Sequence, residues 1–303
     1  MMNTPVLRGT LFEGTSPGMQ SDLIFTAQSA ALRVWAGSLT ADEMSAPSAL
    51  DGWTVADLVG HLVAVHDAVA ALRPVEPAPA ADRREAAGGG AADSAESAGG
   101  EAAGGTAAAV EATAGTATGG EAAAASTAGD RMAAERDQNA DGAPALTVNE
   151  YLQGYAGSKQ RVADMARTIS RDTAADPLGA WDNAAAQAKR TLGALGAADR
   201  LVSTRRGPMM ASAFLDTRVI ELVVHAGDLR RSLPQHPAPP VLPSAQQRVL
   251  ATLREVLTAR ARQPAVLAAA SALSPEQFVD LATGRARPEP DLQAELAAVL
   301  PLL

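Results

Sequence analysis

A glutamate and a histidine near residue 220 have the types and the spacing to bind a metal ion. Glu221 and His225 are four residues apart, so on a helix they lie one above the other on the same face. Their neighbours are apolar, and a carboxylate that faces an apolar wall is costly unless a positive charge compensates it. A divalent cation would do so. The alternative is an ordinary surface Glu–His pair, which contributes only a few tenths of a kcal/mol.

A second histidine, His61, lies far upstream in a segment with helical periodicity. Thr54 and Asp57 have the spacing of a capping box, which predicts that this helix starts at Thr54. His61 lies one turn after Asp57, at the edge of the apolar stripe. His66 is about 140° further round the helix, so the two histidines cannot share a site through it. A histidine at the core edge, bonded to backbone or water, is the alternative for His61.

Composition limits the classes of function. The chain has 303 residues, 3% of them aromatic, and its hydrophobic residues suit helix packing better than a β-sandwich. The net charge of −9 argues against nucleic acid or an anionic membrane as the main partner. Cysteine is absent, so a metal would have to bind His, Asp or Glu. With no 18-residue apolar run and no visible secretory signal, we expect a cytoplasmic protein.

Periodicity predicts an all-α core, a four-helix bundle over residues 18–233. Its helices are expected over 21–38, 54–73, 147–172 and 209–232. Thr147 and Glu150 form a second capping box, and Pro208 suits the first position of the last helix. A loop carrying Trp181 and a short helix over 183–195 are expected in between.

Residues 74–145 form an insertion rich in Ala, Gly, Glu and Ser. No aromatic residue and no leucine occurs between Leu72 and Leu146. Such a segment cannot bury enough apolar surface to offset the entropy of ordering it. We therefore predict that the insertion is disordered.

His61, Glu221 and His225 would meet if their two helices face each other in the bundle. Two histidines and one carboxylate on facing helices can hold a divalent ion with coordination positions left open. Zinc, with bonds of about 2.0–2.1 Å and water in the open positions, fits this set. Non-haem iron suits the same ligands.

Two motifs resemble the mycothiol-dependent maleylpyruvate isomerase metal-binding domain family, which belongs to the DinB-like superfamily of four-helix bundles. The first, W-x3-DL-x2-HL, is matched by Trp53, Asp57, Leu58, His61 and Leu62. The second, R-x2-E-x3-H-x2-D-[IL]-R, is matched by Arg218, Glu221, His225, Asp228, Leu229 and Arg230. The resemblance covers about residues 20–73 and 146–233.

The resemblance implies that His61, Glu221 and His225 bind the metal. It also implies that Arg218, Asp228 and Asp57 support these ligands or face the substrate; an ion pair of Arg218 with Asp57, Glu43 or another acid is the alternative. Relatives with known activity use a small thiol such as mycothiol, whose sulfur the metal would activate. We expect a small-molecule thiol and substrate as partners, and the sequence indicates no oligomeric state. Two functions remain open: a metal- and thiol-dependent isomerase or S-transferase, and a metal-binding or helical interaction protein without catalysis.

Residues 241–303 form a separate C-terminal unit that resembles a truncated sterol-carrier-like domain. The match lies in Phe278–Arg285 and in Leu300–Leu303. Between Gln263 and Leu273, however, an Ala-rich run replaces the β-rich sequence that a lipid-carrier sheet needs. We therefore expect a small helical or mixed α+β unit without a sterol-binding cavity.

Overall fold

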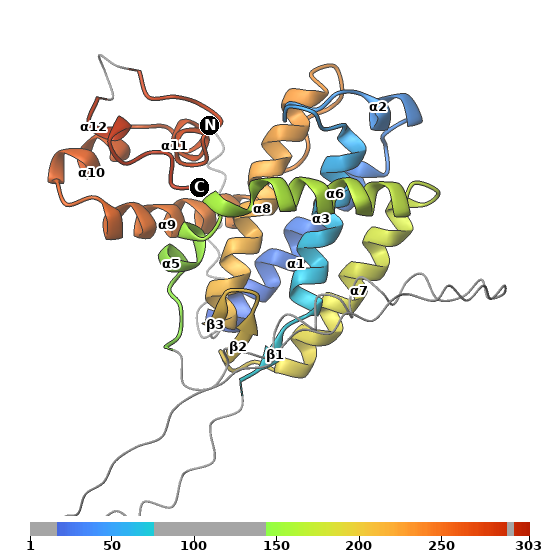
Figure 1. Cartoon of the computed structure of the whole chain (residues 1–303), viewed down its shortest axis with the longest axis horizontal. Helices are drawn as coiled ribbons and strands as arrows, with labels where there is room; N and C mark the ends of the chain where they lie inside the picture. Colours follow the sequence, from blue (N-terminus) through green and yellow to red (C-terminus); the bar gives the residue numbers. More distant parts are fainter. Residues whose placement is uncertain (1–16, 76–143, 290–293) are drawn as a thin grey trace, which may run out of the picture. The chain divides into compact units, whose positions relative to one another are not determined.

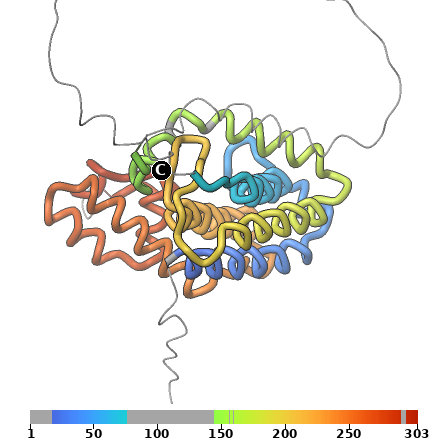
Figure 2. Tube along the Cα trace, turned by 90° about the horizontal axis from the view of Figure 1, so that it is seen from below, coloured from blue at the N-terminus to red at the C-terminus, as the bar shows by residue number. Residues whose placement is uncertain are grey.

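Four long helices form the core of the protein. The computed structural model describes residues 17–75, 144–289 and 294–303, so nearly all of the expected disordered insertion, 74–145, lies outside the described residues. The bundle helices are α1 (Pro17–Ala36), α3 (Val55–Ala70), α7 (Pro177–Leu195) and α8 (Ala211–Ser232). They lie side by side (Figures 1 and 2), with α3 packed on α7 and α8, and α1 packed on the same two helices. The predicted all-α core is confirmed.

The predicted helix starts are built from local hydrogen bonds. Thr54 Oγ1 accepts from the Asp57 backbone N–H at 3.1 Å, and Asp57 Oδ2 accepts from the Thr54 N–H at 2.8 Å. The predicted capping box at Thr147 is also present. Further boxes occur at Ser274 and at Thr40, where the short helix α2 (Ala41–Ser45) begins. Each box satisfies backbone N–H groups that the first helical turn leaves without a partner.

The single helix predicted over 147–172 is wrong. The chain forms α5 (Val148–Gln153), a 3-10 turn η1 (Ala156–Ser158) and α6 (Lys159–Asp172). The break lies at Gly154, where a Cβ atom would come within 2.6 Å of Arg206 Nε. Arg206 also donates to the Gly154 carbonyl at 3.1 Å. The two halves pack in different places: α5 contacts α8 and α9, whereas α6 crosses α3 (Figure 1).

The loop predicted around Trp181 is instead part of α7, the fourth bundle helix. Asp176 caps this helix by accepting from the Gly179 N–H at 2.8 Å, and Pro177 occupies its first turn. Trp181 is almost fully buried. Trp181, five positions after its capping residue, therefore belongs to the core, and α7 takes the place in the bundle that residues 147–172 were expected to fill.

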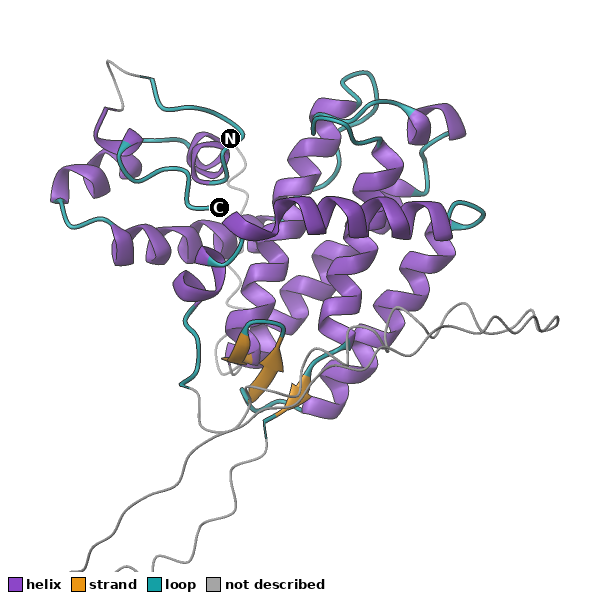
Figure 3. Cartoon of the chain, in the orientation of Figure 1, coloured by secondary structure: helices purple, strands orange, loops and turns teal. Residues whose placement is uncertain are grey.

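A small antiparallel sheet lies at one end of the bundle (Figure 3). It consists of β1 (Arg73–Pro74), β2 (Leu201–Thr204) and β3 (Gly207–Met210), with β2 in the middle. Pro208 pairs with Ser203 in this sheet, so its predicted place at the start of the last helix is wrong. α8 begins three residues later, because the turn at Gly207, where φ is +132°, folds the chain into a hairpin first.

The described part of the C-terminal unit is helical. It contains α9 (Pro243–Arg260), α10 (Pro264–Ser271), α11 (Pro275–Ala282) and α12 (Ala294–Ala297). Between residues 241 and 303, no strand occurs in the described ranges. No helix in the described part of the chain is long and apolar enough to cross a membrane.

The crossing of α3 and α6 depends on Gly60. A Cβ atom there would lie 3.0 Å from the Ala166 carbonyl oxygen and 3.0 Å from the Ser170 nitrogen, both of which are backbone atoms. Backbone cannot swing aside as a side chain can. Any larger residue at this position would therefore require the backbone of α6 to move away from α3.

We predict that Gly60→Ala lowers the free energy of unfolding by about 1–3 kcal/mol, because it forces two backbones apart in a packed core. The matched control is Gly193→Ala on α7, where a Cβ atom would meet nothing within 4 Å. There the higher helix propensity of alanine should stabilise the protein by up to about 1 kcal/mol. Urea denaturation of both variants measures the difference, and equal effects would contradict the close crossing.

His66 is a core residue on the side of α3 away from His61. Its Nδ1 donates to the Leu62 carbonyl at 2.7 Å, which leaves Nε2 to accept from the Ser29 hydroxyl. Phe25 and Trp181 pack against its ring. Burial lowers the pKa of His66 to about 4, so the imidazole is neutral at neutral pH.

We predict that the titration of His66 lowers the free energy of unfolding as the pH falls from about 6.5 to about 4. In this window the unfolded chain binds the proton more tightly than the folded chain, so the free energy of unfolding rises with pH, by up to about 3 kcal/mol in total. His66→Gln keeps a donor for Leu62 and an acceptor for Ser29 but does not titrate. The difference between the two proteins in unfolding free energy, measured from pH 4 to 7, should follow this rise; a constant difference would contradict it.

Candidate metal centre

The structure brings His61, Glu221 and His225 together. His61 Nε2 lies 3.3 Å from Glu221 Oε2, and His225 Nε2 lies 3.2 Å from the same oxygen. One ligand atom from each of the three residues lies within 4.8 Å of the others. α3 supplies His61 and α8 supplies the other two, so the two helices that were expected to face each other do so.

Hydrogen bonding fixes the orientation of the His225 ring. Its Nδ1 lies 2.8 Å from Asp228 Oδ2. A carboxylate can only accept, so Nδ1 carries the proton and Nε2 is the nitrogen that faces Glu221. Metal-binding histidines use this arrangement, in which a carboxylate holds the far nitrogen of the ring.

Arg285 of the C-terminal unit and Arg231 of α8 hold Asp228. Its carboxylate is 1% exposed and contacts Arg285 Nη2 at 2.9 Å and Arg231 Nη2 at 2.7 Å. Arg231 also bonds Asp280 at 3.2 Å. A chain of charged contacts therefore runs from α11 and the turn after it, through Asp228, to His225.

The protonation states in the cluster follow from burial and these contacts. Burial alone would raise the pKa of Glu221, but hydrogen bonds from His225 and His61 outweigh it and hold that pKa well below its usual range. Burial lowers the pKa of His61. For His225, the hydrogen bonds to Asp228 and Glu221 outweigh burial and raise the pKa. The cluster thus contains an ionised carboxylate, a neutral imidazole and an imidazole whose proton the two carboxylates stabilise.

Arg218 lies beside this cluster without a carboxylate partner. It is almost fully buried and donates to the Tyr155 hydroxyl and, at 3.1 Å, to Thr217 Oγ1. Its guanidinium lies 4.9 Å from the centre of the Phe214 ring. No ion pair of Arg218 with an acid occurs in the described part of the chain, so the alternative pairing with Asp57 or Glu43 does not form. Burial raises the pKa of Tyr155, so its hydroxyl stays protonated.

Asp57 and the other two histidines have other roles. The hydrogen bonds of Asp57 with described residues go to Thr54, as a helix cap, and none goes to the cluster. His66 is bonded to Ser29 and Leu62, and His236 lies 2.8 Å from Glu43. The structure therefore offers no support for Asp57 as a residue of the site, whereas Asp228 and Arg218 lie where they were expected.

The donor set and its surroundings fit a divalent cation. Two imidazole nitrogens and a carboxylate oxygen are ligands that zinc accepts. The Nδ1 of His61 is buried without a hydrogen-bond partner among the described residues, and the edge of Trp53 covers this ring at 5.9 Å. A cation bound at Nε2 would place the proton of this ring on Nδ1, as Asp228 already does for His225.

Sequence reasoning missed three residues around the cluster. Tyr155 lies in the segment predicted as a bundle helix and received no role, yet its hydroxyl meets Arg218. Arg231 and Arg285 received no role. Arg231 lies three residues after Asp228, which is a spacing for helical ion pairs that could have been noticed. Arg285 is 57 residues from Asp228, and only the three-dimensional structure brings it there.

A helical bundle with two histidines and a carboxylate on facing helices defines a class of candidate metal proteins. Residues 25–152 match the family described as mycothiol maleylpyruvate isomerase N-terminal domain. Over this range the chain is similar to that family, which supports the resemblance seen in the first motif. The match includes His61 and ends before Glu221, and it does not reach the C-terminal unit, whose sterol-carrier resemblance stays a prediction. No curated protein and no solved structure matches the chain significantly.

We predict that Asp228→Asn destabilises the protein by about 3 kcal/mol, because it leaves two arginines around a buried position without their charge partner. The control is Asp280→Asn, at a carboxylate of the same network that is about one-third exposed. Its loss should cost less than about 1 kcal/mol. Urea denaturation of both variants gives the comparison, and similar costs would mean that Asp228 does not support the site as described.

Proposed function

We propose that the protein binds one divalent cation through His61, Glu221 and His225 and uses it to activate a small thiol. The observation that supports this most is the Glu221 carboxylate, enclosed by two imidazoles whose nitrogens lie 3.2 and 3.3 Å from one of its oxygens. Zinc is the proposed metal and mycothiol the proposed thiol, in line with the family that matches residues 25–152. The reaction class is isomerisation or S-transfer, in the cytoplasm, where small thiols are kept reduced.

A cation bound by these ligands would lower the pKa of a coordinated thiol and supply a thiolate near neutral pH. The chain's own groups prepare the site. Asp228 keeps the proton of His225 on Nδ1, so Nε2 points at Glu221. Glu221 is ionised and needs no deprotonation before it can act as a ligand.

Arg218 is the proposed group for an acidic substrate. It is a buried guanidinium with no carboxylate partner in the described structure, and it lies one turn before Glu221 on α8. A planar guanidinium can hold a carboxylate with two parallel hydrogen bonds. The Tyr155 hydroxyl accepts from Arg218 and so sets the direction of the guanidinium. A substrate carboxylate bound there would lie close to the cluster.

Non-catalytic metal binding is the second candidate, and burial is the observation that favours it. His61 and His225 are 7% and 6% exposed, and the Glu221 side chain is 15% exposed. A centre this enclosed can serve as a structural staple between α3 and α8. Thiol-dependent turnover separates the two functions.

We predict about one divalent ion per chain, and a sharp loss of metal in His61→Ala, because three protein ligands are the fewest that such a site uses. His66→Ala and His236→Ala are matched controls, since both histidines contact other partners. Metal analysis of the purified proteins by mass spectrometry gives the ratio. Loss of metal in His66→Ala as large as in His61→Ala would mean that the wrong histidine has been chosen.

We predict that Arg218→Lys retains metal and loses most of the thiol-dependent turnover of maleylpyruvate-like substrates. Lysine keeps the charge but not the planar fork that holds a carboxylate. Metal content and turnover are measured on the same preparation. Full turnover with full metal would remove Arg218 from substrate binding, and no turnover in the unmodified protein with either maleylpyruvate-like or electrophilic substrates would favour the non-catalytic candidate.

A further inference from the structure

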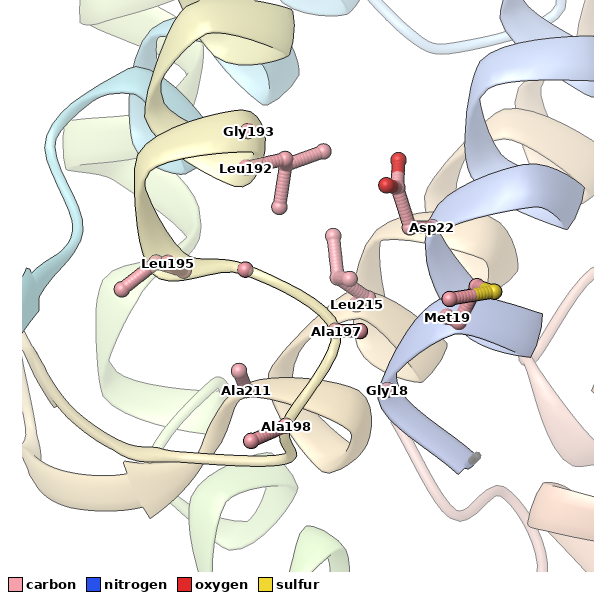
Figure 4. A pocket seen from close by; sticks show the side chains of 11 residues that line it. Gly18, Met19, Asp22, Leu192, Gly193, Leu195, Ala197, Ala198, Ala211 and Leu215 are labelled. Carbon is pink, nitrogen blue, oxygen red and sulfur yellow. The ribbon is translucent and has the colours of Figure 1, made fainter. Parts of the chain in front are cut away.

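Two cavities open between α1 and α7, and they differ in chemistry. One, of about 260 Å³, lies between the start of α1 and the chain just after α7 (Figure 4). Small and apolar residues line it, and Asp22 is its one charged lining residue. The other, of about 320 Å³, lies further along the same two helices and combines aromatic, polar and cationic groups. The second cavity is independent of the metal cluster, because its residue on α3 is His66.

The floor of this second cavity is polar, and its polar groups are bonded to one another. His66 Nδ1 donates to the Leu62 carbonyl, and Nε2 accepts from the Ser29 hydroxyl. The Trp181 indole N–H donates to Ser29 Oγ at 3.3 Å. The side-chain donors of His66, Ser29 and Trp181 are therefore all used in these hydrogen bonds. A ligand that reaches the floor therefore needs no polar group at its inner end.

The walls are apolar, which suits a hydrocarbon body. Phe25 and Trp181 lie deep, and alanines and a leucine from both helices complete the lining. At about 30 Å³ per water-sized group, the volume holds roughly ten such groups. This is at the lower end of the range for small-molecule pockets.

The rim has a neutral end and a cationic end. At one end Arg33 and Asp182 form a bidentate pair, with distances of 2.8 and 2.7 Å. Lys189 follows Asp182 by seven residues on α7, about 10 Å further along the helix. It is exposed and forms no ion pair or hydrogen bond with any described residue. A carboxylate at this end would meet an unpaired cation.

We propose that this cavity binds a small amphipathic carboxylate of about ten non-hydrogen atoms. Its hydrocarbon body lies between α1 and α7 against Phe25 and Trp181, and its carboxylate pairs with Lys189. The closed hydrogen-bond set of Ser29, His66 and Trp181 receives the apolar end.

Octanoate is a probe of this size and charge, and octanol is the matched neutral probe. Calorimetric titration of the full chain should show saturable binding of octanoate, with octanol weaker by several-fold, since an exposed ion pair is worth at most about 1 kcal/mol, or about fivefold. Lys189→Glu should weaken octanoate about tenfold and leave octanol unchanged. Arg190→Glu makes the same charge change at the next residue, outside the cavity lining, and should change octanoate binding less than twofold.

Larger side chains in the cavity lining test whether the two probes bind in this cavity. Ala185→Leu should abolish binding of both probes, and Ala30→Leu on the facing helix is a second filling variant whose folding does not depend on the first. Circular dichroism confirms that each variant is folded. The proposal is overturned if octanoate gives no saturable heat, if Lys189→Glu and Arg190→Glu weaken it equally, or if both folded filling variants still bind it.

Discussion

The partly buried carboxylate of Glu221 is the group on which the candidate centre depends. An ionised carboxylate among apolar side chains must be compensated, and here two imidazoles on different helices do so through one oxygen. His61 comes from α3 and His225 from α8, so these contacts require the two helices to keep their spacing and register. His225 needs a further acid, Asp228, and that acid needs two arginines. Each group in the series compensates the charge of the one before it.

This dependence extends into the C-terminal unit. Arg285 lies just beyond α11 and reaches Asp228 with two nitrogens. The described part of this unit is helical, and its most direct contact with the candidate centre is electrostatic. The unit therefore helps to fix the position of Asp228, and Asp228 in turn fixes the orientation of the His225 ring. On the other side of the cluster, Gly60 lets α6 lie close against α3, one residue before His61.

Features that depend on a few neighbouring residues could be predicted from the sequence. The caps at Thr54 and Thr147 require only residues three positions apart, and the apolar stripes of α1 and α3 follow from helical periodicity. Features that depend on distant partners could not. Gly154, at the end of α5, lies against Arg206, and Pro208 lies in a strand that pairs it with Ser203. The meeting of His61 with Glu221 was predicted through the two motifs, whereas Arg285 and Tyr155 join the site only through the fold.

Anomalous X-ray scattering from crystals of the purified protein, recorded above and below the zinc edge, tests most directly whether His61, Glu221 and His225 together hold one divalent cation. We predict a single strong peak per chain, about 2.0–2.1 Å from an Nε2 of each histidine and from a carboxylate oxygen of Glu221. A map from zinc-soaked crystals with no peak between these three side chains, or with the peak at His66 or His236, would contradict it.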